Sequence, residues 1–459
     1  MIFNDSDTIV APATPTGGAL CIIRVSGEDA IAVCDKVFRG RKPLSEATTA
    51  TVMYGDVVDG DEVVDDVLVS IFRAPRSYTG EDSVEISSHG SRYIVERILS
   101  LIIGRGARMA EAGEFTRRAF LNGRMDLSQA EAVADIIASD SHASHAIATT
   151  QMRGAYSEEL QHLRSKLLNI TSLLELELDF SEEDVEFANR AQLVELLQHT
   201  LAKVELLANS FSLGNALKEG ITVAIAGRPN VGKSTLLNRL AGEERAMVSD
   251  IAGTTRDTIE VTTNICGVIY RFVDTAGLHA TSDRLEQMGI ERTTQALSKA
   301  RIILWLTDDA TSSFEQDLVG YMPREEQMVV RILTKIDLRG GVAMQEYSEP
   351  HTIALSAKTG EGVDKLMQVL GTAADADSAY RGDVIVSNRR HYHALRNAAE
   401  ALTSALEALQ NNIPTDLLSE DIRLAIHHLG SITGEINSED ILKNIFSQLR
   451  TCGGPGGSG

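Results

Sequence analysis

The segment from Gly227 to Ser234 reads Gly-Arg-Pro-Asn-Val-Gly-Lys-Ser, which is the phosphate-binding pattern G-x-x-x-x-G-K-[ST]. In this pattern the glycines allow backbone N–H groups to close around phosphate oxygens. Lys233 reaches the β- and γ-phosphates, and the Ser234 hydroxyl binds Mg²⁺. An apolar run at residues 221–226 precedes the loop and leucines at helical spacing follow it, so the loop leads from a strand into the positive end of a helix. The sequence therefore predicts a nucleotide site that begins with Asn230, Val231, Gly232, Lys233, Ser234 and Thr235.

A second segment, Asp274-Thr275-Ala276-Gly277, follows another strand-like run. Asp274 is expected to hold Mg²⁺ through water, and the N–H of Gly277 can approach the γ-phosphate. Both groups would then lie at the end of a strand that faces the phosphate-binding loop.

Two later segments select the base. Thr334-Lys335-Ile336-Asp337 follows the apolar run 328–333, and the Asp337 carboxylate can accept the N1 and N2 hydrogens of guanine, which adenine cannot supply. A buried carboxylate left unpaired by the wrong base rejects it by roughly 10⁴-fold. Ser356-Ala357-Lys358 offers backbone N–H groups to the guanine O6. Thr334 replaces the usual asparagine of Asn-Lys-x-Asp, which predicts one weaker loop-bracing hydrogen bond. Four such segments in this order predict a GTPase domain rather than unrelated turns.

The position that holds a water-orienting glutamine in Ras-like switches is Leu278, which cannot hydrogen-bond a water. Hydrolysis then needs another water-positioning group, for which Glu286 is a candidate. Thr255 is the natural second Mg²⁺ hydroxyl, in a loop that orders around the γ-phosphate. We take Arg256 as a solvated loop charge rather than an arginine finger.

The composition limits the classes of protein. A length of 459 residues indicates two or three domains, and 43% apolar with 24% charged residues is typical of globular proteins. A net charge of −22 argues against broad nucleic-acid affinity, although RNA can still bind a local patch or jointly with a partner. The basic cluster Arg389-Arg390-His391 with His393 is taken as a solvated helix start. The four cysteines form no C-x-x-C pair, and no segment resembles a membrane span or a signal peptide, so we expect a cytoplasmic protein without structural zinc.

The pattern of apolar residues predicts three regions and a tail. Residues 1–122 mix strand-like runs with helices and are expected to form an α+β domain. Residues 123–215 and 378–447 carry apolar side chains at helical spacing and are expected to form one all-α domain. Residues 216–377 are expected to form an α/β P-loop (Ras-like) domain inserted between the two helical parts, and the Gly-rich residues 448–459 a flexible tail.

Five further motifs lie outside the GTPase segments. They are Asp7-Thr8-Ile9-Val10-Ala11 with Ala13-Thr14-Pro15, Tyr78-Thr79-Gly80-Glu81-Asp82, Gly113-Glu114-Phe115-Thr116-Arg117-Arg118-Ala119-Phe120-Leu121-Asn122, Asp126-Leu127-Ser128-Gln129-Ala130-Glu131-Ala132, and Gly430-Ser431-Ile432-Thr433-Gly434-Glu435. With these motifs the chain resembles the MnmE (TrmE) family of bacterial tRNA modification GTPases, from the N-terminus to about Ser447.

The resemblance implies a function. Members of the family add a carboxymethylaminomethyl-type group at C5 of the wobble uridine of certain tRNAs, together with the FAD-dependent partner MnmG. The N-terminal domain forms the homodimer and binds a one-carbon donor, a 5-formyl- or methylene-tetrahydrofolate. By resemblance Arg24, Glu81 and Arg124 line this folate site, with Arg124 where lysine is common. Without the family, Glu81 reads as a turn-capping acid and Arg24 as a solvated strand end.

The resemblance also implies that paired G domains hold K⁺ where an arginine finger would reach. Asn230 matches the side-chain ligand of K⁺, and Ser249, Ile251 and Thr254 match the surrounding loop. Hard oxygen ligands of this kind suit an alkali cation, whose charge stabilises the γ-phosphate as bonds loosen. Glu286 matches the glutamate that orients the attacking water.

The resemblance stops before the end of the chain. Family chains end in Cys-Ile-Gly-Lys soon after an Ile-Phe-Ser segment, whereas Ile445-Phe446-Ser447 is here followed by Gln448-Leu449-Arg450-Thr451-Cys452. The role of the family cysteine is therefore not assigned to Cys452, and we expect weak or absent modification activity.

Other functions remain open from the residues alone. The main alternative is a GTPase switch in ribosome or RNA-particle assembly without chemistry on RNA, and a third is a folate enzyme that does not need its GTPase. Binding of a reduced folate by the N-terminal domain distinguishes a tRNA modification GTPase from the assembly switch.

Overall fold

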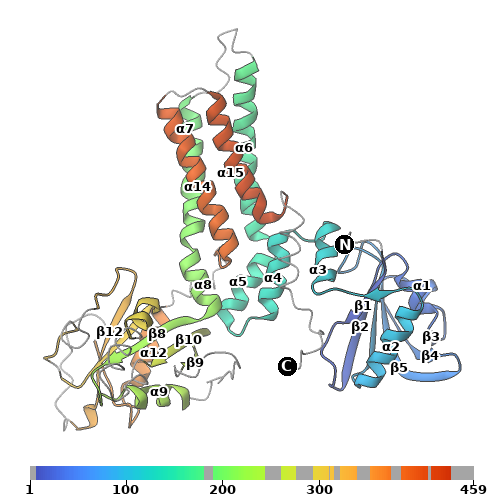
Figure 1. Ribbon diagram of the computed structural model, residues 1–459, viewed down its shortest axis with the longest axis horizontal. Coiled ribbons are helices and arrows are strands. Elements are labelled where there is room, and N and C mark those ends of the chain that lie inside the picture. Colours follow the sequence, from blue (N-terminus) through green and yellow to red (C-terminus); the bar gives the residue numbers. More distant parts are fainter. Residues whose placement is uncertain are drawn as a thin grey trace, which may run out of the picture. The chain divides into compact units, whose positions relative to one another are not determined.

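The structure is a computed structural model that describes residues 7–179, 190–242, 260–274, 293–309, 311–314, 321–338, 352–373, 384–411 and 415–435 (Figure 1). The chain divides into two compact units, with divisions after Ile137, Thr150, Arg164 and His428. Within these described ranges, no helix is both long enough and apolar enough to cross a bilayer.

The first unit is built on a seven-stranded sheet with the strand order β3-β4-β5-β6-β2-β1-β7. Neighbouring strands are antiparallel except for β1 and β7, which are parallel. The strands are β1 (Ile9–Pro12), β2 (Leu20–Ser26), β3 (Phe38–Gly40), β4 (Thr51–Asp59), β5 (Glu62–Phe72), β6 (Ser83–His89) and β7 (Arg108–Met109). The helical segments are α1 (Ala30–Asp35), η1 (Leu44–Glu46), α2 (Arg92–Gly104), α3 (Glu114–Leu121) and α4 (Leu127–Ile137).

Alternation along the strands separates the two faces of this sheet. Val67, Val69 and Ile71 of β5 are buried in one core together with residues of α1 and α2, so these helices cover that face. Successive side chains point to opposite faces of a strand. Arg24 of β2 and Glu85 of β6 are register partners on the other face, so the sheet places a charged pair on the side that α1 and α2 do not cover.

Helix α3 is fixed against strand β1. Gly113, at φ +72°, immediately precedes the helix, and Phe115 is buried against Ile9 and Ala11. Glu114 and Arg118 are four residues apart, so they share one face of α3.

The second unit contains a six-stranded sheet with the order β13-β12-β11-β8-β10-β9. All neighbours are parallel except β9 and β10. The strands are β8 (Ile221–Gly227), β9 (Glu260–Ile265), β10 (Val268–Asp274), β11 (Ile302–Thr307), β12 (Met328–Leu333) and β13 (Thr352–Ala354). Apolar clusters lie on both faces, as expected for a parallel sheet covered by helices on each side. The associated helical segments are α8 (Phe211–Glu219), α9 (Lys233–Gly242), η4 (Ile336–Leu338) and α12 (Val363–Ala373).

Long helices make up most of the remaining described chain, and α7 and α14 lie side by side (Figure 1). The helices are α5 (His142–Met152), α6 (Ala155–Asp179), α7 (Arg190–Asn209), α14 (Arg389–Gln410) and α15 (Thr415–Thr433). The side chain of Asn388 caps α14 by accepting a hydrogen bond from the Arg390 N–H at 2.8 Å. The basic cluster here is not a fully solvated helix start, because His391 is buried and its Nε2 lies 2.9 Å from an Arg390 nitrogen.

Candidate functional site

The phosphate-binding loop leaves the carboxyl end of β8 in a conformation that requires glycine. Gly227 has φ +146°, and a Cβ atom there would lie 2.2 Å from the backbone oxygen of Leu306 in the neighbouring strand β11. Asn230 and Gly232 also have positive φ, +63° and +104°. Helix α9 then begins at Lys233. The local geometry is therefore the turn from strand to helix that the spacing predicts, with backbone N–H groups available to an anion.

Lys233 is held inside this loop. The residue is only 4% exposed, and its ammonium donates to the backbone oxygens of Gly227 at 2.7 Å and Arg228 at 2.9 Å. These contacts fix a positive charge within the loop. Fixed charge stabilises developing negative charge without reorganisation during the reaction.

Thr334 braces the loop from the neighbouring strand. It follows β12, is buried, and its hydroxyl donates to the Val231 backbone oxygen at 2.7 Å. The Thr307 oxygen lies 3.3 Å from the same hydroxyl. The sequence predicts a weaker brace where threonine replaces asparagine, but the hydroxyl still reaches the loop carbonyl at a short distance. The phosphate-binding and base-selecting segments are thus joined directly.

The base-selecting residues lie beyond the ends of β12 and β13. Lys335 is in a left-handed conformation at φ +58°, and its ammonium contacts the Asp308 carboxylate at 2.8 Å. Asp337 lies in the short helix η4 and is exposed. Ser356 is buried, and its backbone N–H donates to the Glu361 oxygen at 2.9 Å, which closes the turn that carries Ala357 and Lys358.

Of the residues predicted for the nucleotide site, those that the structure describes lie at one edge of the sheet. The parallel strands have their carboxyl ends at this edge, and ligands of such sheets bind outside the carboxyl ends of the strands. Asp274 ends β10 in register with Ile225 of β8. The other members at this edge are Asn230, Val231, Gly232, Lys233, Ser234, Thr235, Thr334, Lys335, Asp337, Ser356, Ala357 and Lys358. The predicted site residues that lie outside the described residues are Ser249, Ile251, Thr254, Thr255, Thr275, Ala276, Gly277 and Glu286. Arg256, Leu278 and all residues after 435, including the predicted tail, also lie outside them.

A second feature, a cavity of about 380 Å³, lies in the first unit. Its lining residues are Arg24, Phe72, Arg76, Ser77, Tyr78, Ser83, Glu85 and Arg124. Arg24 pairs with Glu85 at 2.8 Å and lies over the rings of Tyr78 and Phe115, 4.9 and 5.6 Å from their centroids. The cavity thus combines aromatic faces, three guanidinium groups and one carboxylate.

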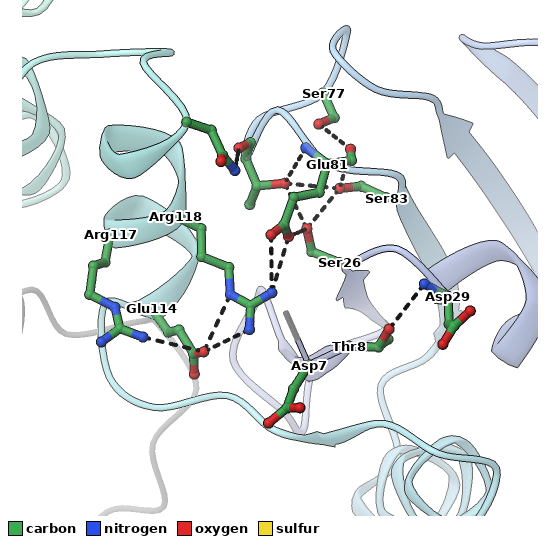
Figure 2. A network of polar contacts seen from close by, with 12 residues as sticks. Asp7, Thr8, Ser26, Asp29, Ser77, Glu81, Ser83, Glu114, Arg117 and Arg118 are labelled. Atoms are coloured by element: carbon green, nitrogen blue, oxygen red, sulfur yellow. Dashed lines mark hydrogen bonds and ion pairs between the residues drawn. The ribbon is translucent and has the colours of Figure 1, made fainter. Parts of the chain in front are cut away.

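Two of the three predicted folate residues, Arg24 and Arg124, line this cavity. Gly80 lets the Arg124 side chain approach closely, since a Cβ atom there would lie 3.2 Å from its Cγ. Glu81 is not among the lining residues. Its carboxylate accepts hydrogen bonds from Arg118 at 3.1 and 3.2 Å and from the Ser26 hydroxyl at 2.8 Å (Figure 2).

Glu114 lies next in this network and is almost fully buried, at 1% exposure. It receives two hydrogen bonds from Arg108, at 2.7 and 2.9 Å, and one from the backbone N–H of Glu111. Burial by itself raises the pKa of Glu114, but the hydrogen bonds from Arg108 and Glu111 and the charges of Arg108 and Arg118 lower this pKa from 4.5 to about 2. The same pairing raises the pKa of Arg108. Glu114 is therefore ionised throughout the neutral range.

Sequence reasoning did not indicate that Glu85 and Tyr78 line the cavity or that Arg118 contacts Glu81. Arg118 and Tyr78 stood in the motifs that carry the resemblance, but nothing in their spacing assigned them a role. Strand alternation could have placed Arg24 and Glu85 on one face, but only the pairing of β2 with β6 makes them partners. Among the residues described, no group of three or more His, Cys, Asp or Glu side chains is arranged to hold a metal ion.

A mixed sheet with a phosphate-binding loop and a Thr-Lys-x-Asp loop at its carboxyl edge defines a P-loop GTPase domain. The chain matches the family "GTP-binding protein TrmE N-terminus" over residues 8–124 and the family "MnmE helical domain" over residues 127–449, a range that includes the nucleotide segments. The chain belongs to the MnmE family.

Full-length relatives agree with this assignment. Proteins named tRNA modification GTPase MnmE from Bacteroides fragilis and Bacteroides thetaiotaomicron are 50% and 49% identical to the chain, covering 97% of it and 99% of their own length. The protein of that name from Cytophaga hutchinsonii is 46% identical over 98% of both chains. A crystal structure of Aquifex aeolicus Era is 25% identical over 39% of this chain and 66% of its own, with a TM-score of 0.27, too low to add to the assignment.

Proposed function

We propose that this chain hydrolyses GTP in the reaction that adds a carboxymethylaminomethyl-type group to C5 of the wobble uridine of tRNA. The relatives named above are tRNA modification GTPases, and the family covers nearly the whole chain. One observation carries the GTPase part of the proposal. Lys233 is fixed by two loop carbonyls while Thr334 joins that loop to the base-selecting segment.

In the proposed reaction the backbone N–H groups of the loop and of the first turn of α9 bind the phosphates of GTP. Lys233 neutralises charge that develops on the β- and γ-phosphates, and Asp337 selects guanine. Ser234 and Asp274 lie at the same edge, and the oxygen groups of their side chains suit Mg²⁺, with Thr255 as the second hydroxyl.

The water and the positive charge come from residues around the loop. Asn230 lies in the loop in a left-handed conformation and is exposed, which leaves its amide oxygen suited to a cation. With oxygens of Ser249, Ile251 and Thr254 it would hold K⁺, which supplies the charge that an arginine supplies in other GTPases. We assign the orientation of the attacking water to Glu286, because the side chain of Leu278 has no hydrogen-bonding group.

The first unit is proposed to bind a reduced folate, a 5-formyl- or methylene-tetrahydrofolate. The residues that line the cavity fit such a molecule, because a folate combines a flat polar ring system with a carboxylate tail. Tyr78 and Phe72 offer aromatic faces, Glu85 can accept ring N–H groups, and Arg124 can pair with a carboxylate. Arg24, Glu81 and Arg124 remain the residues proposed from the family.

We further propose the arrangement of domains and partners that the family implies. The GTPase domain of residues 216–377 is inserted between helical parts 123–215 and 378–447, which is supported by the contact between α7 and α14. The chain forms a homodimer through residues 1–122 and acts on tRNA with an MnmG-type FAD-dependent partner.

The test is GTP turnover by the full chain in KCl and in NaCl, with and without 5-formyl-tetrahydrofolate. Turnover should rise strongly in K⁺, and the folate should raise the melting temperature of the first unit. Lys233→Met should abolish turnover, whereas the exposed Lys365→Met should leave it unchanged. No binding of GTP or GDP at micromolar concentration would exclude the proposal, and equal rates in both salts would exclude the cation mechanism.

A further inference from the structure

Arg118 connects the predicted folate residue Glu81 to the interior of the first unit. It is 1% exposed and lies on α3, and one of its terminal nitrogens donates to both oxygens of the Glu81 carboxylate, at 3.1 and 3.2 Å (Figure 2). The two residues are 37 positions apart in the chain. We propose that Arg118 is a positioning residue that holds the Glu81 carboxylate in the orientation needed to bind the reduced folate, an inference that rests on the proposed folate function.

Arg118 is itself held in place from the other side. Its Nε and its second terminal nitrogen donate to Oε1 of Glu114, at 3.3 and 3.0 Å. Arg108 holds Glu114 through two hydrogen bonds and contacts Asp7 at 3.1 Å. The signs of charge alternate from Asp7 through Arg108, Glu114 and Arg118 to Glu81. A planar guanidinium with five donors can serve two carboxylates in fixed directions, which the point charge of a lysine cannot.

The network reaches the wall of the cavity through hydroxyl groups. Ser26 donates to Glu81 at 2.8 Å and lies 3.1 Å from the hydroxyl of Ser83, which lines the cavity. Ser77, another lining residue, donates to the Glu81 backbone oxygen at 2.5 Å. Glu81 is therefore bonded to the lining residue Ser77 and, through Ser26, linked to the lining residue Ser83, although it does not itself line the cavity. A carboxylate has about four lone-pair positions, so the bonds from Arg118 and Ser26 still leave acceptor capacity for a ligand.

A purely structural role is the competing explanation, and it makes a different prediction. Buried ion pairs are weak evidence for stability, because apolar residues of similar volume often replace them at little cost. With a structural role, the loss of folate affinity would follow the fall in melting temperature, whichever of the two adjacent arginines is replaced. Arg117 provides the control, since it contacts Glu114 at 3.6 Å from the same helix turn, whereas Arg118 contacts both Glu114 and Glu81.

The experiment measures binding of 5-formyl-tetrahydrofolate to the full chain by calorimetry, with melting temperature recorded for each variant. Arg118→Met should weaken binding by about 10-fold or more, because the Glu81 carboxylate loses the charged partner that orients it. Arg117→Met should stay within about 2-fold of the unaltered chain even where its melting temperature falls. In a Glu81→Gln background, Arg118→Met should cost less than about 3-fold, because coupled residues are not additive. Arg118→Lys should be intermediate and stands in if Arg118→Met does not fold.

Three results would overturn the inference. One is an Arg118→Met or Arg118→Lys variant that binds as tightly as the unaltered chain. Another is an Arg117→Met variant that loses as much affinity as the Arg118 variant. The third is an unaltered chain that binds no reduced folate, which would exclude the proposed folate function along with this inference. The first two results would exclude only the role of Arg118.

Discussion

Replacing Glu114 by glutamine should destabilise the first unit at neutral pH, and the loss should shrink as the pH falls. The pKa of Glu114 is lowered to about 2 from an ordinary value of 4.5, and the residue is 1% exposed. A carboxyl group whose folded-state pKa is depressed stabilises the fold above its unfolded pKa, and this contribution disappears as the pH falls through the folded pKa. The two pKa values correspond to about 3 kcal/mol at pH 7 and about 1.4 kcal/mol at pH 3.

The assay is differential scanning calorimetry of the full chain, comparing Glu114→Gln with the unaltered protein at pH 7 and pH 3. About 3 kcal/mol corresponds to a melting temperature lower by on the order of 10 °C for the affected transition. The difference at pH 3 should be less than half of that at pH 7, and it should fall to about 0.4 kcal/mol at pH 2. Glu62→Gln, at an exposed position of β5, is the control and should change stability by less than about 0.5 kcal/mol at either pH.

A difference between Glu114→Gln and the unaltered protein that stays constant from pH 7 to pH 3 would refute this reasoning. It would mean that the substitution acts through shape or packing and not through the charge that Arg108 and Arg118 stabilise. No destabilisation at pH 7 would equally show that the network does not depend on this carboxylate.

Three predictions concern the nucleotide site. Gly227→Ala should abolish GTP binding, because a Cβ atom 2.2 Å from the Leu306 oxygen forces the loop to move, at a cost of about 3 kcal/mol or more. Equilibrium binding of a fluorescent GDP measures the loss of affinity, and an unchanged affinity would contradict the prediction. Thr334→Val should weaken GTP binding by about 5- to 100-fold, since the Val231 carbonyl loses its buried hydrogen bond at a cost of about 1–3 kcal/mol, and Thr334→Ser should largely preserve the affinity in the same titration. Glu286→Ala should slow single-turnover hydrolysis by orders of magnitude with GTP affinity nearly unchanged, because the residue acts only as charge develops; a parallel loss of affinity would point to a binding role instead.

The nucleotide site could be predicted in outline because each of its parts is local. A strand, a loop and a helix follow one another within residues 221–242, so the order of residue types is enough to indicate their geometry. The strands β10 and β12 were likewise indicated by apolar runs before polar residues. Strand β11 was not identified, although all six of its residues are buried. A short continuous apolar run cannot be told from a buried helical segment without its neighbours, and pairing with β8 and β12 decides its identity.

The brace between Thr334 and Val231 could not be read from the chain. The two residues are 103 positions apart, and the residue type at 334 does not indicate which carbonyl its side chain reaches. The length of a side chain sets its reach only once the distance between two backbones is known, and that distance comes from the spacing of β8, β11 and β12 in the sheet.

By itself, the sequence determined that the chain carries a guanine-nucleotide site, since this site follows from ordered motifs. A folate-binding N-terminal domain is a prediction that rests on the resemblance to the family. The tertiary structure decided what Glu81 contacts. As a residue in a turn it could cap that turn or face a ligand, and only the packing of α3 on β1 brings Arg118 to its carboxylate. The physical reason is that local propensities fix the order of elements along the chain, whereas the partner of a buried charge depends on which elements pack together in space.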